Sequence, residues 1–147
     1  MQQADPSVQN EALSREFVFT GDPAAMIAAR DRIMDFLHHY CADEQEEIDI
    51  LVALQEGLAN AVLHGCHRDP SKVVRCWVEV EPEAITITIK DPGGGFDAAA
   101  MIDKPECGVN LSDHGRGISL MRSLMDEVSY RDGGSELHLR RVRVPRA

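Results

Sequence analysis

The chain has 147 residues, of which 44% are hydrophobic and 27% charged, and this composition is ordinary for one globular domain with a buried core. A formal net charge of −10 argues against direct binding of nucleic acid, because no large positive surface is available to collect phosphates. No apolar run has the length of a membrane span and no basic-then-apolar leader opens the chain, so we expect a cytoplasmic protein without membrane contact.

The N-terminal half predicts one strand followed by two helices. Residues 1–13 are polar and are expected to be flexible, whereas the alternating run REFVFT at 15–20 predicts a strand. A helix is expected over about 23–40, because Asp22 at the N-cap and a proline at the first helical position are typical of a helix start. A second helix is expected over 43–63, ended by Gly65.

The predicted second helix has an apolar face and a polar stripe. At about 100° per residue, the apolar face consists of Ile48, Leu51, Val52, Leu58, Ala59, Val62 and Leu63. Glu56, Asn60 and His64 follow one another at four-residue spacing along one edge of that face. A polar pair on a helix edge is usually solvated, so the stripe alone is weak evidence for a site.

The C-terminal half predicts two hairpins separated by a loop and a helix. The runs 73–80 and 84–90 read as antiparallel strands, and the second alternates isoleucine with threonine, as a strand covered on one face does. Residues 98–114 lack a period and predict a mobile loop, 116–128 predict a helix, and the last hairpin turns at 132–134.

Helices and hairpins therefore come in blocks and not in βαβ alternation. This order predicts an α+β fold, a two-layer sandwich with helices on one face of a mixed, mostly antiparallel sheet. No repeat or composition break divides the chain, so we expect a single domain over 14–147.

Three short motifs carry the candidate chemistry. The first is the helical stripe, the second is the run from Asp91 to Gly95 in IKDPGGGFD, and the third is the glycine pair Gly115 and Gly117 in HGRGISL. A glycine turn after a hairpin and a flexible helix entry are each common in ordinary folds. Their occurrence in this order, after an acid and an amide one helical turn apart, is much less expected by chance.

These motifs resemble those of the GHKL ATPases, which include histidine-kinase catalytic domains and the gyrase and mismatch-repair ATPases. QEGLANAVLHG, IKDPGGGFD and HGRGISLMRSLMDEVSY look closest to the small bacterial anti-sigma-factor serine kinases, and the resemblance covers about 15–141. It implies the two-layer sandwich of the GHKL (Bergerat) type, with ATP and Mg²⁺ as ligands.

The resemblance assigns the adenine end of the site. Asp91 matches the aspartate that accepts a hydrogen bond from the adenine amino group, and an acceptor-only carboxylate selects an amino-purine over an oxo-purine. Gly93 and Gly95 would let the backbone lie close to the base. Ser135 falls where the family usually has threonine, and its hydroxyl would support Asp91 directly or through water.

The resemblance also assigns the phosphate end. Asn60 matches the Mg²⁺ ligand, and Glu56, about 6 Å earlier along the helix axis, matches the general base. Backbone N–H groups at a helix start hold phosphate oxygens, and the matching residues are Gly115, Arg116 and Gly117. Residues 98–114 would be the lid over the triphosphate. His64 either satisfies backbone at the helix end or orients groups near the metal.

The favoured function is an ATP-dependent protein serine/threonine kinase that acts as an anti-sigma factor. The resemblance implies that it binds a sigma factor, phosphorylates an anti-sigma-factor antagonist and forms a homodimer. The alternative is a nucleotide-binding module that sequesters a partner with little or no kinase turnover. Glu56 favours the kinase, because a pure binder needs no base at that position.

Other interpretations fit the residues less well. Residues 93–98 match G-x-G-x-x-A, but the strand–helix–strand unit of a dinucleotide site is missing. His64, Cys66 and His67 are close in sequence, yet no paired C-x-x-C supports a zinc site. A histidine kinase is disfavoured because no dimerising helical hairpin with a phosphoacceptor histidine precedes the domain.

Overall fold

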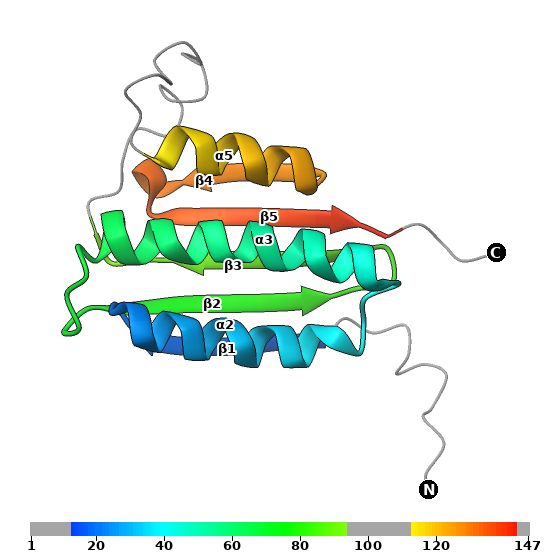
Figure 1. Cartoon of the computed structure of the whole chain (residues 1–147), viewed down its shortest axis with the longest axis horizontal. Coiled ribbons are helices and arrows are strands. Elements are labelled where there is room, and N and C mark those ends of the chain that lie inside the picture. The colour runs from blue at the N-terminus through cyan, green and yellow to red at the C-terminus, as the bar shows by residue number, and fades with distance from the viewer. Residues whose placement is uncertain (1–12, 94–112, 144–147) are drawn as a thin grey trace, which may run out of the picture.

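A computed structural model of the chain describes residues 13–93 and 113–143, with the side chains of the second range described from Gly117 onward. One five-stranded sheet carries the helices of the described residues on one of its faces (Figure 1). The elements in chain order are β1 (Leu13–Thr20), α2 (Pro23–His38), α3 (Glu44–Asn60), a π-helical turn η1 (Ala61–Gly65), β2 (Val73–Val80), β3 (Ala84–Lys90), α5 (Asp113–Leu124), β4 (Glu127–Arg131), a 3₁₀ turn η3 (Asp132–Gly134) and β5 (Glu136–Val142).

The sheet has the strand order β1-β2-β3-β5-β4, and every neighbouring pair is antiparallel. The predicted α+β sandwich with helices on one face is therefore confirmed. Strands β2 and β3 have the predicted bounds, and the isoleucines of β3 are buried below the helices while its threonines lie on the opposite face. No helix within the described ranges is long and apolar enough to span a bilayer.

Side-chain caps start the two long helices where the sequence predicts them. Asp22 accepts a hydrogen bond from the backbone N–H of Ala25 at 3.1 Å, with proline in the first turn of α2. Asp43 accepts from the N–H of Glu46 at 2.8 Å, and the Glu46 carboxylate accepts from the N–H of Ala42 at 3.0 Å. Reciprocal caps of this kind satisfy N–H groups that a helix start leaves without partners.

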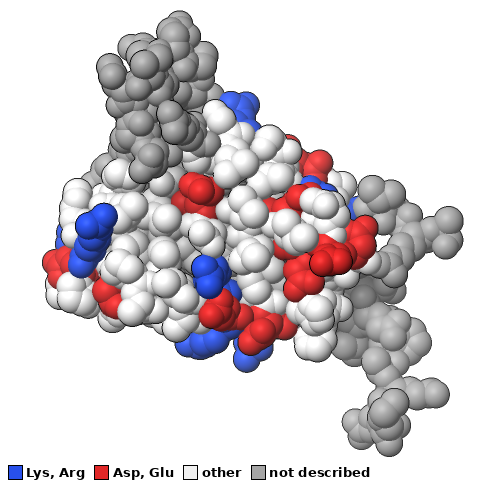
Figure 2. All heavy atoms as spheres, in the orientation of Figure 1, with Lys and Arg blue, Asp and Glu red and all other residues white. Residues whose placement is uncertain are grey.

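Acidic side chains gather over the first turns of α3 (Figure 2). Negative charge at a helix N-terminus is favourable because it opposes the helix dipole. Arg141 from β5 balances part of this charge, since its guanidinium lies 3.3 Å from Asp49 and 4.0 Å from Glu46, which is only 7% exposed. The cluster ties the start of α3 to β5.

The buried face of α3 differs from the predicted one. Ile48 is 44% exposed, and the most buried strip consists of Ile50, Ala53, Leu54, Gly57 and Leu58. The helix lies across the sheet between α2 and α5, so apolar side chains on its flanks also find neighbours (Figure 1). The apolar face predicted from the sequence therefore does not coincide with the strip of α3 that contacts the sheet.

Two helix ends also differ from the prediction. The α-helical part of the second helix ends at Asn60 and continues as a π-helical turn up to Gly65. The third helix begins at Asp113 and ends at Leu124, not at residue 128. Its early end has a local cause: the N–H of Asp126 donates to the carbonyl of Arg140 at 2.9 Å, which draws the chain into the β4–β5 pairing.

A glycine allows α3 to lie close to the sheet. A methyl group at Gly57 would come within 2.7 Å of Leu137 Cδ2 and 2.9 Å of Ile89 Cδ1. Both side chains are buried, so neither can move aside without disturbing the core. This contact sets the distance between α3 and the sheet. It therefore also sets how far the site residues on α3 lie from the sheet.

Replacing Gly57 by alanine should lower the free energy of unfolding by about 1–3 kcal/mol through overpacking, although alanine is the better helix former. Chemical denaturation measures the change. Arg122→Ala, an exposed substitution on α5, serves as the control and should change stability by less than about 0.5 kcal/mol. A Gly57→Ala protein as stable as the wild type would show that the helix can lift from the sheet at no cost.

Candidate functional site

Asp91 occupies the first position after β3 and is held there by backbone hydrogen bonds. Its N–H donates to the carbonyl of Ser135 at 2.9 Å, and its Oδ1 accepts from the N–H of Gly93 at 2.9 Å. The residue is only 8% exposed. Burial raises the pKa of the carboxyl group, against the smaller lowering effects of the Gly93 N–H and the charges of His67 and Lys72. A fixed, poorly hydrated acceptor of this kind suits a ligand that brings its own hydrogen-bond donor.

Two glycines join the end of the long helix to the turn that carries Asp91. A Cβ atom at Gly65 would lie 2.1 Å from Asp91 Cγ, and one at Gly93 would lie 2.1 Å from the carbonyl oxygen of Gly65. Real Cβ atoms do not approach other atoms so closely, so glycine at 93 lets the two backbones meet and glycine at 65 leaves the space that the Asp91 carboxylate fills. The close approach that Gly93 permits in this structure is therefore to Gly65; the predicted approach to a base stays a prediction.

Glu56 and Asn60 lie one turn apart on α3, as the sequence predicts. Asn60 is 7% exposed and Glu56 is half-buried. The π-helical turn begins directly after Asn60. Because a π-helix has more residues per turn than an α-helix, His64 does not continue the four-residue alignment of Glu56 with Asn60. Single π-helical turns inside α-helices are frequent at functional sites.

The first turns of α5 face this pair. A Cβ atom at Gly117 would lie 2.8 Å from Glu56 Oε2 and 3.7 Å from Asn60 Nδ2. Gly117 is buried, and the absence of a side chain leaves room for the Glu56 carboxylate. The structure therefore brings the start of α5 against the acid and the amide on α3.

Tyr130 joins these groups, and sequence reasoning missed it. Burial raises the pKa of its hydroxyl to about 12; the adjacent Asn60 amide lowers it, and the carboxylates of Asp91 and Glu56 raise it further. The pKa of this hydroxyl thus depends on the neighbouring Asn60 amide and on the charges of Asp91 and Glu56. The alternation of VSYR assigns Tyr130 to the covered face of β4, but nothing in the sequence indicates that Asn60 lies above it.

Of the other predicted site residues, one makes a different contact from the predicted one and the rest are described only in part or not at all. The hydroxyl of Ser135 donates to the carbonyl of Asp132 at 3.0 Å, so Ser135 reaches Asp91 through its backbone carbonyl. Gly95 and residues 98–112 of the predicted lid lie outside the described residues. Gly115 and Arg116 belong to the first turns of α5, and the Arg116 side chain lies outside the description.

The described side chains offer hydrogen-bonding groups to a ligand and do not form a metal centre of their own. The buried Asp91 carboxylate can only accept hydrogen bonds, and in the described part of the chain the buried Asn60 Nδ2 has no acceptor in hydrogen-bond geometry. No group of three or more His, Cys, Asp or Glu residues within the described ranges could hold a metal ion. The site thus offers an acceptor at one end and an amide at the other.

Comparisons with known proteins find matches that extend over most of the chain. The model of the histidine kinase-like ATPase domain family matches residues 19–141. The anti-sigma F factor of Anoxybacillus flavithermus is 32% identical over 127 residues, covering 82% of this chain and 74% of the relative. Those of Geobacillus sp. strain WCH70 and Bacillus cytotoxicus are 32% and 31% identical, covering 82% and 89% of this chain and 73% and 83% of the relatives.

The raised pKa of Asp91 predicts a pH-dependent penalty on the ligand-free fold. Because the pKa of Asp91 is raised in the folded state, its favourable contribution to the free energy of unfolding is present below its ordinary pKa of 3.8. This contribution is lost as pH rises through the pKa of the folded state. Without nucleotide at pH 7, Asp91→Asn should therefore melt at or above the wild-type temperature, and the difference should shrink as pH falls towards 3.

Thermal melts between pH 3 and 7 measure this difference. Glu79→Gln, which removes an exposed carboxylate on β2, is the control and should follow the wild-type curve. An Asp91→Asn protein that is less stable than the wild type at pH 7 would mean that the charged carboxylate stabilises the empty fold.

Proposed function

The chain belongs to the histidine kinase-like ATPase domain family, and from this we propose that it is an ATP-dependent protein serine/threonine kinase that acts as an anti-sigma factor. The family is one of ATPase domains, so the chain binds ATP. The anti-sigma role is supported by relatives of that name, whose similarity extends over most of both chains. We propose that residues 14–147 form one such domain.

The observation that carries the proposal is a pair of close contacts at the end of the long helix: Gly117 of α5 lies against Glu56 and Asn60, and Gly65 lies against the Asp91 carboxylate. In the proposed complex the adenine amino group donates a hydrogen bond to the buried Asp91 carboxylate. A carboxylate has no hydrogen to donate to the carbonyl oxygen of an oxo-purine. The phosphates would then extend towards the start of α5, where the backbone N–H groups of Gly115, Arg116 and Gly117 would hold their oxygens.

The acid and the amide have separate roles in the proposed transfer. The amide oxygen of Asn60 would hold Mg²⁺, which would offset the negative charge of the phosphates. Glu56 would take the proton from the serine or threonine hydroxyl while that oxygen bonds to the γ-phosphorus and the bond to the β-phosphate oxygen breaks, releasing ADP. The close contact at Gly117 fixes the Glu56 carboxylate beside α5.

The partners in this proposal are proteins. The chain would bind a sigma factor, phosphorylate an antagonist protein that otherwise displaces it, and work as a homodimer in the cytoplasm. The net charge of −10 supports a protein partner over direct contact with nucleic acid. Identifying the proteins that co-purify with the chain would show which sigma factor and which antagonist it binds.

Phosphotransfer to a co-purifying antagonist tests the role of Glu56. The wild-type protein with Mg-ATP should label the antagonist on serine or threonine. Glu56→Gln should slow labelling by about 10²–10⁴-fold, because it removes the base but keeps the shape, and ATP affinity should change little. Glu44→Gln, at an exposed position on the same helix, is the matched control and should transfer phosphate at the wild-type rate.

Two outcomes would contradict this part of the proposal. If Glu56→Gln labels the antagonist as fast as the wild type, Glu56 is not the base. If the wild type binds ATP and the sigma factor but labels no co-purifying protein, the chain is a nucleotide-binding sequestering module.

The glycine contact behind Asp91 predicts a second effect on ATP. Gly65→Ala places a methyl group where the Asp91 carboxylate lies, so the carboxylate must move. ATP affinity, measured by calorimetry, should fall by about tenfold or more, because a displaced acceptor loses its charge-assisted hydrogen bond to the base. Ala59→Ser, a small-residue change at a half-buried position on the same helix, is the comparison and should retain most of the affinity. Wild-type affinity in a folded Gly65→Ala protein would remove Asp91 from the adenine site.

A further inference from the structure

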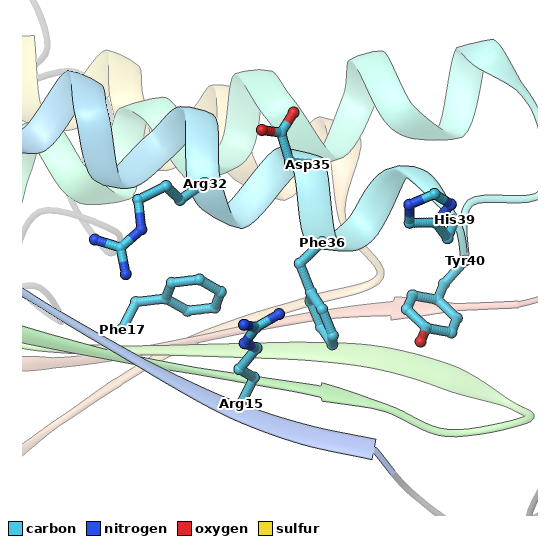
Figure 3. Close-up of a pocket in the computed structure, with 7 residues that line it drawn as sticks. All are labelled: Arg15, Phe17, Arg32, Asp35, Phe36, His39 and Tyr40. Atoms are coloured by element: carbon cyan, nitrogen blue, oxygen red, sulfur yellow. The ribbon is translucent and has the colours of Figure 1, made fainter.

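A hollow of about 470 Å³ lies between β1 and the C-terminal half of α2 (Figure 3). It is at the opposite end of the helical layer from the end of α3, where Asn60 lies (Figure 1). None of its lining residues belongs to the nucleotide site described above. The hollow therefore needs its own explanation.

Three aromatic side chains make its floor. The Phe17 and Phe36 rings have centroids 6.3 Å apart in an edge-to-face arrangement, and the Phe36 and Tyr40 rings are 5.3 Å apart. Phe17 is 4% exposed, while Phe36 and Tyr40 are half-buried and partly accessible from the surface. Packed aromatic rings of this kind form a stiff apolar surface against which another side chain can lie.

Two arginines from different elements converge on this floor. The Arg15 guanidinium on β1 lies 5.8 Å from the Phe17 ring centre and 5.4 Å from that of Phe36. The Arg32 guanidinium on α2 lies 5.9 Å from the same Phe17 ring. Cation–π contacts do not use the N–H donors of a guanidinium, so the donors stay available to an anion.

The local charge is positive in a strongly acidic chain. Other arginines of the described structure, such as Arg75 and Arg141, lie within 4.0 Å of a carboxylate, but Arg15 and Arg32 form no ion pair with any described residue. Asp35 borders the hollow, yet its carboxylate points away from both guanidiniums (Figure 3). The two guanidiniums beside the apolar floor thus have no carboxylate within ion-pair distance among the described residues.

We propose that this arginine–aromatic pocket, formed by Arg15, Arg32, Phe17, Phe36 and Tyr40, is a docking site for an acidic segment of a partner protein. Carboxylates of the segment pair with the Arg15 and Arg32 guanidiniums, and a neighbouring apolar side chain packs on Phe36 and Tyr40. Charge complementarity selects an anion, and the aromatic floor selects one with an apolar neighbour, which inorganic anions lack. The net charge of −10 opposes a long polyanion such as nucleic acid.

The pocket works independently of the proposed kinase chemistry. Docking here uses no residue of the nucleotide site, so it requires neither ATP nor Glu56. A partner held at this end of the helical layer leaves the region around Asp91 accessible, and one molecule can then bind protein and nucleotide at the same time.

A pair of blocked peptides tests the proposal on the full-length protein. The probe is acetyl-Glu-Phe-Glu-amide, and its neutral counterpart is acetyl-Gln-Phe-Gln-amide. NMR signals of the arginine Nε–H groups report binding at each guanidinium. The acidic peptide should shift the Arg15 and Arg32 signals saturably, and the neutral peptide should bind about tenfold more weakly or worse.

Matched double variants separate the site from overall charge. Arg15→Gln with Arg32→Gln should lose about tenfold or more of the acidic-peptide affinity. Arg122→Gln with Arg131→Gln removes the same charge from exposed positions on α5 and β4 and should bind within about twofold of the wild type. Circular dichroism melts establish that each double variant is folded before its affinity is compared.

Several results would overturn the proposal. One is equal binding of the acidic and neutral peptides, and another is unchanged affinity in the Arg15/Arg32 variant. Absence of saturable binding at roughly 10 mM peptide counts against it too, since that concentration detects even very weak sites. Inorganic phosphate binding as tightly as the peptide would show a simple anion site. If sedimentation finds a wild-type dimer that the Arg15/Arg32 variant dissociates, the pocket is a contact between copies of this chain.

Discussion

The backbone contact between Gly65 and the turn at Asp91 is the constraint on which the candidate site depends. A Cβ atom at Gly93 would meet the backbone of Gly65, and one at Gly65 would meet the Asp91 carboxylate, so the end of the long helix lies directly against the turn after β3. This contact brings a carboxylate on the sheet towards an acid and an amide on the helix. The π-helical turn contributes, because it carries the chain from Asn60 to Gly65 with a wider winding than an α-helix.

The same end of the molecule holds polar groups that the fold by itself does not favour. Asp91 and Asn60 are nearly buried, Asp91 has a raised pKa, and the Asn60 amide nitrogen has no acceptor among the described residues. Buried polar groups of this kind lower stability unless a ligand completes their hydrogen bonds. Close-packed aliphatic side chains between the sheet and the helices stabilise the fold and offset the cost of these buried polar groups.

The helical layer separates two proposed activities. The nucleotide chemistry that we assign to Glu56, Asn60 and Asp91 lies at the end of α3, and the arginine–aromatic pocket lies at the end of α2 (Figure 1). Acidic side chains cover the start of α3, so that part of the surface is negative (Figure 2), whereas two arginines line the pocket between β1 and α2. A regulator that binds both a protein and ATP needs two surfaces that do not compete, and this arrangement provides them.

Local sequence determined the hairpin at 73–90, the helix caps, the α+β class and the spacing of Glu56 and Asn60, because periodicity, capping and one-turn spacing depend only on near neighbours. Motif order was enough to indicate the family. Tertiary structure alone decided that Ile48 is exposed, that Tyr130 lies beside Asn60, and that arginines from β1 and α2 meet on one ring. Each of these depends on which surfaces distant segments bring together, and the pattern within one segment does not contain that information.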